Sequence, residues 1–230
     1  PWDHKSILVR AFTVSGAEHI YEVFGAESVS LAELANQGVR AKVERTAPKR
    51  HRVVLQGDPG VHRYRQPFAA DGAPHEVSGV IVSASWDATF FSWEGGPDPR
   101  EEIDAWRALA DGPKAVQLTT DSLRFDYGSR GPAQMPWAKG LEGMPGRDRF
   151  AMIARAKLDL SQGAWRFRTL SDDGVRVRVN GTPVIENWTW HAPTKDEVVL
   201  NLSQDTHCEI EVEHFEIDGH AVLMFEIEPI

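Results

Sequence analysis

The chain has 230 residues, more than one average domain and fewer than two large ones. Its apolar content of 41% and charged content of 26% are those of an ordinary globular protein, and no apolar run reaches the roughly 18 to 20 residues of a membrane-spanning helix. The formal net charge of −9 argues against a nucleic-acid partner, because affinity for phosphate backbones comes mainly from Lys and Arg. Cys208 is the only cysteine, which excludes an intrachain disulfide and a thiolate metal cluster.

The first part of the chain predicts four strands. Residues 7–14 and 19–25 are rich in β-branched and aromatic residues, and the Ser-Gly pair between them favours a hairpin. Residues 39–44 and 51–56 predict two further strands. The basic stretch 48–52 lies next to them, and we interpret it as a solvated turn in preference to a binding patch.

A short helix and a domain boundary are expected next to these strands. Ser30, Glu33 and Gly38 have the spacing of a capping box and a glycine stop, which predicts a helix over 30–38. Residues 57–74 are dense in Gly, Pro and Asp, which predicts loops. We therefore expect an N-terminal β-rich segment, residues 1–78, that could end a larger neighbouring domain, followed by a second domain over 79–230.

The second domain begins with a predicted strand over 79–84 and then a predicted helix. Asp98 can cap that helix, Pro99 suits its first position, and Glu101 completes the capping box. Apolar residues then recur at helical spacing up to Gly112.

Beyond residue 150 the apolar residues alternate with polar ones, which is typical of half-buried strands. Asn180 and Gly181 form the pair that a tight hairpin turn requires. Several short alternating strands joined by turns predict a β-sandwich. Its expected core residues are Trp165, Phe167, Val177, Ile210, Val212, Leu223 and Phe225.

Two stretches resemble the protective-antigen-type (PA14) family. These are FRTLSDDGVRVRVNGTPVIENW at 167–188 and VEHFEIDGHAVLMFEI at 212–227, and the SLRFDYGSRGP stretch before them also fits. The resemblance covers about residues 80–230, and nothing in 1–78 matches. It implies an all-β fold, an antiparallel, jelly-roll-like β-sandwich with one or two short helices, and a carbohydrate-recognition or protein-interaction module.

The resemblance also implies a metal site. In the sugar-binding members of this family, paired aspartates bind a calcium ion that holds vicinal sugar hydroxyls, and the loop of the closing hairpin supplies other ligands. The matching residues here are Asp172 and Asp173, with Glu216 and Asp218 as loop candidates. The chain has acidic residues where those adhesins have an Asn and backbone carbonyls.

The chemistry of the Asp pair leaves two interpretations open. Calcium takes about six to eight oxygen ligands, which carboxylates supply. Adjacent side chains on an extended strand point to opposite faces, so convergence on one ion requires an unusual backbone such as a cis peptide. In the alternative, both aspartates cap turn amides and Gly174 provides a special φ.

Aromatic and histidine residues complete the expected site. Trp188 and Trp190 lie two residues apart, and we expect one of them to pack in the core while the other borders a sugar site together with His191. His214 lies in an inward-facing register and is expected in the core. The loops after the strands that end near Leu170, Ile185 and Phe215 are expected to meet at one end of the sandwich.

No nucleophile or phosphate-binding motif is found, and Glu211 and Glu213 are interpreted as solvated sheet surface. The leading hypothesis is therefore a non-catalytic, calcium-assisted module that binds a glycan or polysaccharide. The alternative is an interaction or spacer domain docked on a parent catalytic domain, and an independent enzyme ranks third. The chain begins with Pro1 and has no signal-peptide pattern, so we expect a processed piece of a longer protein. A secreted, periplasmic or cell-surface location is expected from the family alone.

Overall fold

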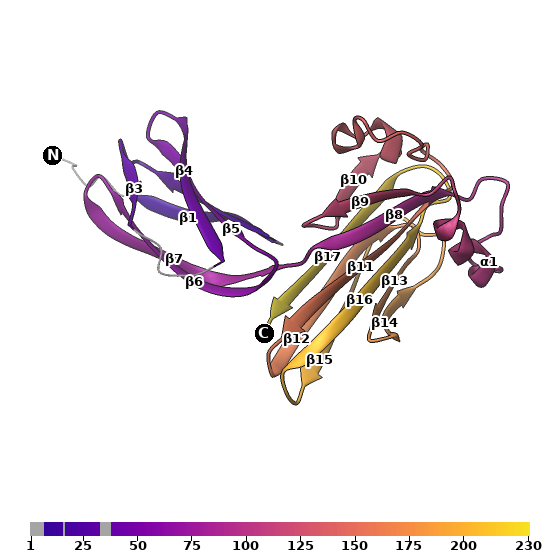
Figure 1. Ribbon diagram of the computed structural model, residues 1–230. Coiled ribbons are helices and arrows are strands. Elements are labelled where there is room, and N and C mark those ends of the chain that lie inside the picture. Colours follow the sequence, from indigo (N-terminus) through magenta and orange to yellow (C-terminus); the bar gives the residue numbers. More distant parts are fainter. Residues whose placement is uncertain (1–6, 16, 33–37) are drawn as a thin grey trace. The chain divides into compact units, whose positions relative to one another are not determined.

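The computed structural model describes residues 7–15, 17–32 and 38–230. The chain divides into two compact units, Pro1–Ala84 and Ser85–Ile230, and in the described residues all strand pairs are antiparallel (Figure 1). Among the described residues, no helix is long and apolar enough to cross a membrane. Most of the described chain is strand, which confirms the all-β prediction.

The described residues of the N-terminal unit form seven strands in two sheets, with the orders β1-β2-β5-β4 and β3-β6-β7. The predicted hairpin over 7–25 is present as β1 with β2, and the strands predicted at 39–44 and 51–56 lie in β4 and β5, which pair with each other. The strands are β1 (Leu8–Ser15), β2 (Glu18–Phe24), β3 (Val29–Leu31), β4 (Val39–Ala47), β5 (Arg50–Gly57), β6 (Gly60–Ala70) and β7 (Ala73–Ser83).

This strand order is the one that immunoglobulin constant-type sandwiches have, with the first, second, fifth and fourth strands in one sheet and the other three in the second. Val23, Val53 and Leu55 of the first sheet pack against Phe68 and Ile81 of the second. The described part of this unit therefore has a core of its own.

Three expectations for this region are wrong. Residues 57–74 are not loops, because β6 alternates buried Tyr64 and Phe68 with exposed residues and pairs with β7 along its whole length. The expected boundary near residue 78 falls within β7, inside the N-terminal unit, whereas the strand expected over 79–84 is present as the end of β7. Ser30 lies in strand β3 and not at a helix start, and residues 33–37 of the predicted helix lie outside the described residues.

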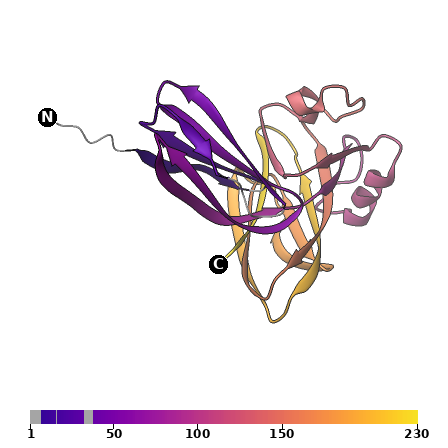
Figure 2. The same cartoon turned by 60° about the vertical axis from the view of Figure 1, so that its left-hand side comes forward.

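The C-terminal unit is a sandwich of two sheets, with the orders β10-β17-β12-β15 and β14-β13-β16-β11-β8-β9 (Figures 1 and 2). The strands are β8 (Trp86–Ser92), β9 (Val116–Thr120), β10 (Arg124–Gly128), β11 (Phe150–Leu160), β12 (Gly163–Asp172), β13 (Val175–Val179), β14 (Thr182–Asn187), β15 (Thr194–Leu202), β16 (Thr206–Phe215) and β17 (Ala221–Pro229). Asn180 and Gly181 have positive φ values of 49° and 78°, as the predicted tight turn requires.

The main core of this unit lies between the two sheets. All seven predicted core residues are buried. Rings from opposite sheets meet there, with Trp86 of β8 5.6 Å from Phe225 of β17 between ring centroids and Phe90 of β8 5.7 Å from Phe125 of β10.

A second apolar cluster lies on the outer face of the six-stranded sheet. It joins Phe91, Ala151 and Phe215 of the sheet to Trp106 of helix α1 (Ile103–Ala108) and to Trp188. The helix begins four residues later than predicted, although the Asp98 carboxylate does accept the backbone N–H of Arg100 at 2.9 Å. The cluster explains how this sheet carries buried residues on both faces.

Short 3-10 turns lie in the connection before β9 and in the connection between β10 and β11. They are η1 (Leu109–Asp111), η2 (Pro132–Gln134) and η3 (Pro136–Ala138). Trp137 of η3 packs on Phe125 with 5.2 Å between ring centroids, so the long connection between β10 and β11 is fastened to the aromatic core.

Candidate functional site

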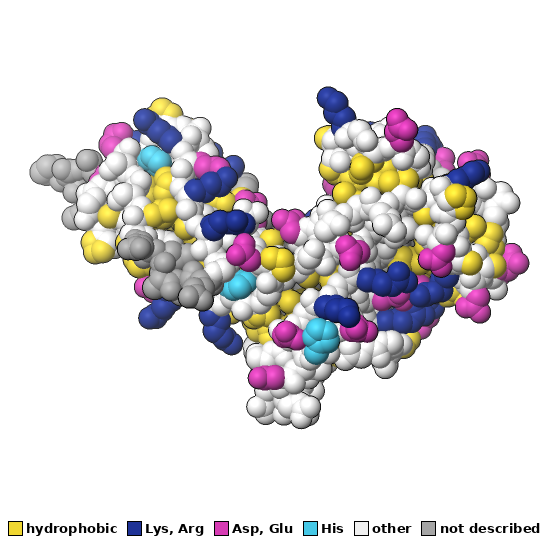
Figure 3. Space-filling model, in the orientation of Figure 1, with side chains coloured by type: hydrophobic (Ala, Val, Ile, Leu, Met, Phe, Trp, Pro, Cys, Tyr) yellow, Lys and Arg dark blue, Asp and Glu magenta, His cyan; other side chains and the backbone are white. Residues whose placement is uncertain are grey.

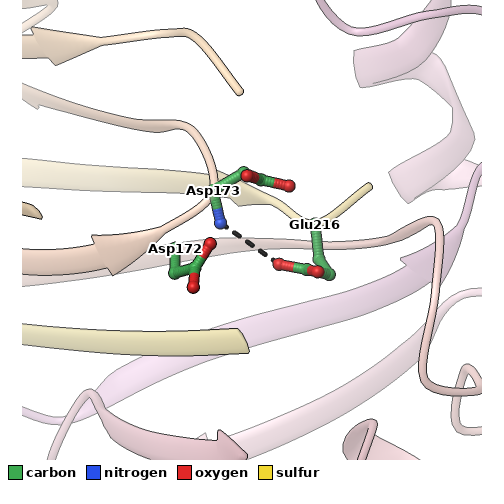
Figure 4. A group of neighbouring side chains, drawn as sticks. All are labelled: Asp172, Asp173 and Glu216. Atoms are coloured by element: carbon green, nitrogen blue, oxygen red, sulfur yellow. Dashed lines mark hydrogen bonds between the residues drawn. The ribbon is translucent and has the colours of Figure 1, made fainter. Parts of the chain in front are cut away.

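Three carboxylates lie together at the end of strand β12. The peptide between Asp172 and Asp173 is cis, and Glu216 approaches both residues from the loop that follows β16 (Figure 4). One carboxylate oxygen from each residue lies within 4.8 Å of the others. The exposed fractions are 6% for Asp172, 1% for Asp173 and 0% for Glu216, so all three acids are buried. Carboxylate oxygens at this spacing can share one metal ion.

Asp173 connects the loops around this group. Its Oδ1 accepts the backbone N–H of His191 at 3.0 Å, and its Oδ2 accepts the backbone N–H of Ile217 at 2.8 Å. Its own backbone N–H donates to Glu216 Oε2 at 3.1 Å. The loops after β12, β14 and β16 therefore meet at one carboxylate, although they are spread over almost fifty residues of sequence.

The environment of the three acids disfavours their ionised forms. Burial raises the pKa of Glu216 to about 10, and the charges of Asp173 and Asp172 add to the effect. Burial also raises the pKa of Asp173 to about 6 despite its two backbone hydrogen bonds, and it raises the pKa of Asp172. Glu216 Oε1 is buried and has no hydrogen-bond partner among the described residues. A bound cation would compensate these charges.

Gly174 allows the end of β12 to pack tightly because it has no side chain, and not because of its backbone conformation as expected. Its φ is not in the positive range, so the predicted special φ is wrong. A Cβ at this position would instead lie 2.2 Å from the Phe215 ring. The glycine is required by this close approach, which brings the ends of β12 and β16 together.

The two predicted tryptophans lie in different environments. Trp188 packs against Phe215 and Trp106, with centroid distances of 4.8 and 5.3 Å, and its Nε1 donates to the Pro99 carbonyl at 2.8 Å. Trp190 is 64% exposed and lies next to His191, whose backbone binds Asp173. One tryptophan is therefore part of the packing and the other is open to solvent.

The residues of the closing hairpin differ in how closely they approach the three acids. Asp218 is exposed and does not belong to the set of mutually close carboxylates, although its charge raises the pKa of Glu216. His220 Nδ1 lies 3.5 Å from Asp172 Oδ2. His214 is fully buried, as predicted, and its Nε2 lies 3.1 Å from the carbonyl oxygen of Asp172. Burial lowers the pKa of His214 to about 4, so it is neutral at pH 7.

Two residues around the group were not found from the sequence. Tyr127 of β10 is fully buried, its hydroxyl has no partner among the described residues, and burial followed by the charge of Glu216 raises its pKa. Arg100 forms an ion pair with Asp98 that raises its pKa, and the charge of Asp173 contributes as well. Nothing in the local sequence signals either residue, because both approach from strands or loops far along the chain.

A second group of buried charges lies nearby on β16, and here the expectation of a solvated surface is wrong. Glu213 is 0% exposed and accepts hydrogen bonds from Arg107, Arg176 and Arg178, with Arg176 Nε at 2.7 Å. Glu211 binds Arg107, Arg155 and Arg178. Figure 3 shows basic and acidic side chains interleaved over β13 and β16. We call these residues the arginine cluster.

The arginine cluster also supports the loop that carries Trp190. The Arg176 guanidinium carbon lies 4.4 Å from the centre of the Trp188 ring. A cation over an indole face is an attractive contact that strengthens when it is shielded from water. The cluster therefore orders the segment between β14 and β15.

Comparison with known proteins gives a family match within the C-terminal unit. Residues 123–227 match the PA14 domain family. No curated protein sequence matches the chain. Three similar solved structures are the PA14 domain of the MpAFP antifreeze protein, the PA14 sugar-binding domain from an RTX adhesin, and the epithelial adhesin 9 A domain from Candida glabrata in complex with Galb1-3GlcNAc.

These likenesses are distant. The antifreeze-protein domain is 15% identical with a TM-score of 0.47, over 63% of this chain and 81% of that one. The RTX adhesin domain is 20% identical with a TM-score of 0.46, over 65% and 91%. The Candida glabrata domain is 13% identical with a TM-score of 0.46, over 64% and 82%.

Proposed function

We propose that the C-terminal unit, which is a PA14-type β-sandwich domain, is a non-catalytic carbohydrate-binding module that uses a bound calcium ion. The observation that carries the proposal is the buried group of Asp172, Asp173 and Glu216, whose carboxylates lie within reach of one ion at the meeting point of three loops.

The residues present fit calcium. It is a hard cation that takes oxygen ligands, and it would supply the positive charge that orients vicinal sugar hydroxyls. Asp172, Asp173 and Glu216 would hold it, and Glu216 Oε1 is a buried oxygen that lacks any other partner among the described residues. Each of the three acids has a raised pKa, which is the electrostatic condition that a cation relieves.

Trp190 supplies the second element of a sugar site. Trp190 directly precedes His191, whose backbone N–H binds Asp173, so its exposed indole belongs to the loop that is joined to the acidic group. A flat aromatic face covers the apolar face of a sugar ring, while polar groups fix the hydroxyls. His191 and the exposed Asp218 border the same loops and could contact the sugar.

The alternative is an interaction or spacer domain that docks on a parent glycan-active enzyme. It is supported by the two backbone hydrogen bonds of Asp173, because a carboxylate that joins two loops can have a purely structural role. In that case the acidic group is structural. An extracellular or cell-surface location and a parent catalytic domain belong to the proposal in either form.

A glycan array, probed with the protein in calcium and in excess chelator, tests the proposal. Signal on defined glycans that disappears with chelator is expected. The Asp172→Asn, Asp173→Asn variant should lose the signal, whereas Asp159→Asn, a change at an exposed aspartate on β11, should keep it. Equal signals in calcium and chelator would refute the calcium role, and no signal on any glycan would favour the spacer function.

A further inference from the structure

The outer face of the sheet β10-β17-β12-β15 has a hollow of about 540 Å³. The volume falls within the range of roughly 300 to 1,000 Å³ that small-molecule sites have. The hollow lies away from the main core, because Arg168 and Leu170 of β12, which line it, alternate in the strand with the buried Trp165 and Phe167.

Two neighbouring cross-strand rows form the hollow. One row runs across all four strands in register, from Arg124 of β10 through Met224 of β17 and Leu170 of β12 to Lys195 of β15. Leu170 and Met224 give this row a half-buried apolar centre, and the cationic residues stand at its two ends.

The second row lies one step farther from the loops and is charged throughout. It consists of Glu226 of β17, Arg168 of β12 and Glu197 of β15. Arg168 lies 3.6 Å from Glu226, and Arg124 also pairs with Glu226. The charged row and the apolar row together give the hollow a floor with polar edges.

Asp172 of the acidic group lies on the same face of β12 as the residues that line the hollow. Asp172 follows Leu170 by two residues, and alternate residues of a strand share a face, so Asp172 occupies the next row toward the loops. Two strand residues span about 7 Å. A chain molecule bound at the acidic group could therefore run directly onto the apolar row.

The charges that line the hollow are balanced. Arg124, Arg168 and Lys195 face Asp196, Glu197 and Glu226, which makes three cations and three carboxylates. In the described part of the chain, Lys195 and Glu197 have no salt bridge and are exposed, so both can bind a ligand. Hydroxyl groups donate and accept hydrogen bonds, so a neutral polyhydroxylated chain can use both kinds of partner, whereas an anionic chain meets three carboxylates.

We propose that this hollow binds the further sugar units of a neutral glycan chain whose first unit occupies the acidic group. The inference rests on the proposed function and specifies its ligand as a neutral oligosaccharide and not a single terminal sugar. Leu170 and Met224 would contact ring faces, and Lys195 and Arg168 would bind hydroxyls beyond the first unit.

Calorimetric titration of the full 230-residue chain in calcium tests this inference. The probes are length series, from one to four units, of neutral glucans, mannans, galactans and xylans, with a polyuronate of equal length for comparison. We expect the affinity to rise about tenfold or more from the monosaccharide to the trisaccharide, as a few added polar contacts would give.

Lys195→Ala should lower the affinity for the trisaccharide several-fold and leave the affinity for the monosaccharide unchanged. The matched control is Lys157→Ala on β11, an exposed lysine of the other sheet, which should change neither. Arg168→Gln provides a second variant, and a thermal melt of each variant checks that it is folded.

The outcomes separate the two proposals. Equal affinity for one and four units, or no effect of either variant, would overturn the inference and leave the carbohydrate-binding function in place. Tighter binding of the polyuronate than of the neutral chains would overturn the inference that the ligand is neutral. Absence of binding to every probe, in calcium and in chelator, would refute the proposed function itself.

Discussion

Glu213 and Glu216 lie three residues apart at the end of β16, both are fully buried, and their surroundings are opposite. Three arginines bind Glu213, whereas Glu216 faces Asp172 and Asp173 and has one unpartnered oxygen among the described residues. A buried carboxylate is stable only if a cation or a proton compensates its charge. In the arginine cluster the protein supplies the cation, and in the acidic group it does not.

The N-terminal unit shows the first of these solutions again. Glu22 is buried on β2 and binds Arg50 at 2.7 Å and Arg52 at 3.2 Å. Hydrogen bonds from Arg50 and then Arg52 lower its pKa despite the opposing effect of burial. An internally compensated acid is a structural element, and an uncompensated group is a candidate binding site, because its missing charge must come from solution.

The largest expected effect is on the arginine cluster. Glu213→Ala should lower the free energy of unfolding by about 3 to 5 kcal/mol, because it leaves three arginines without their buried partner. Chemical denaturation measures the change. Glu209→Ala, on the same strand in an exposed pair with Lys157, is the control and should cause little change. A loss for Glu213→Ala as small as that of the control would show that solvent enters the cluster.

The second effect concerns the acidic group, where a bound cation should stabilise the folded protein. At a calcium concentration of 100 times Kd, the bound ion should stabilise the fold by about 2.7 kcal/mol. Thermal denaturation in calcium and in chelator measures this difference, and Asp172→Asn, Asp173→Asn should abolish it. Identical melting curves for the unaltered protein in both conditions would contradict the metal site.

A smaller effect is expected from pH. The folded-state pKa values of Asp173 and Glu216 are about 6 and about 10, above their ordinary values of 3.8 and 4.5. Between its ordinary and its folded-state pKa, each group binds more protons in the folded protein than in the unfolded chain. The free energy of unfolding should therefore fall as the pH rises from about 4 through 6 and beyond.

Melting temperatures in chelator from pH 4 to pH 8 test this sign. The comparison is with Asp173→Asn, Glu216→Gln, which should lose less stability over the same range. Glu211 has the opposite sign, because its arginine partners outweigh burial and lower its pKa, so its contribution disappears as pH falls. If the double variant has the same pH dependence as the unaltered protein, groups other than Asp173 and Glu216 cause that dependence.

The smallest effect on stability should come from Trp190. Trp190→Ala should leave the melting temperature unchanged, since the side chain is 64% exposed, and weaken glycan binding by about 0.5 to 1.5 kcal/mol, or roughly two- to tenfold. Trp188→Ala is the comparison, and it should destabilise the fold because that ring packs on Trp106 and Phe215. Unchanged glycan affinity for Trp190→Ala would remove this residue from the site.

Much of the C-terminal fold could be predicted from the sequence, because strand patterns are local. Alternation identified Trp165 and Phe167 as inward-facing, and Asn180-Gly181 identified the turn, since backbone conformation and side-chain period act over a few residues. In the N-terminal unit, β6 was missed because its Gly and Pro content hid the alternation of Tyr64 and Phe68.

The sequence by itself determined that carboxylates gather near residues 172 and 216, and that strands alternate around them. Only the tertiary structure decided which carboxylates are compensated. Alternation places Glu213 on an outer face, and that face becomes buried because α1 delivers Arg107 and Trp106 from more than a hundred residues away. The charge state of a buried acid depends on its neighbours in space, and those neighbours are set by the packing of distant segments.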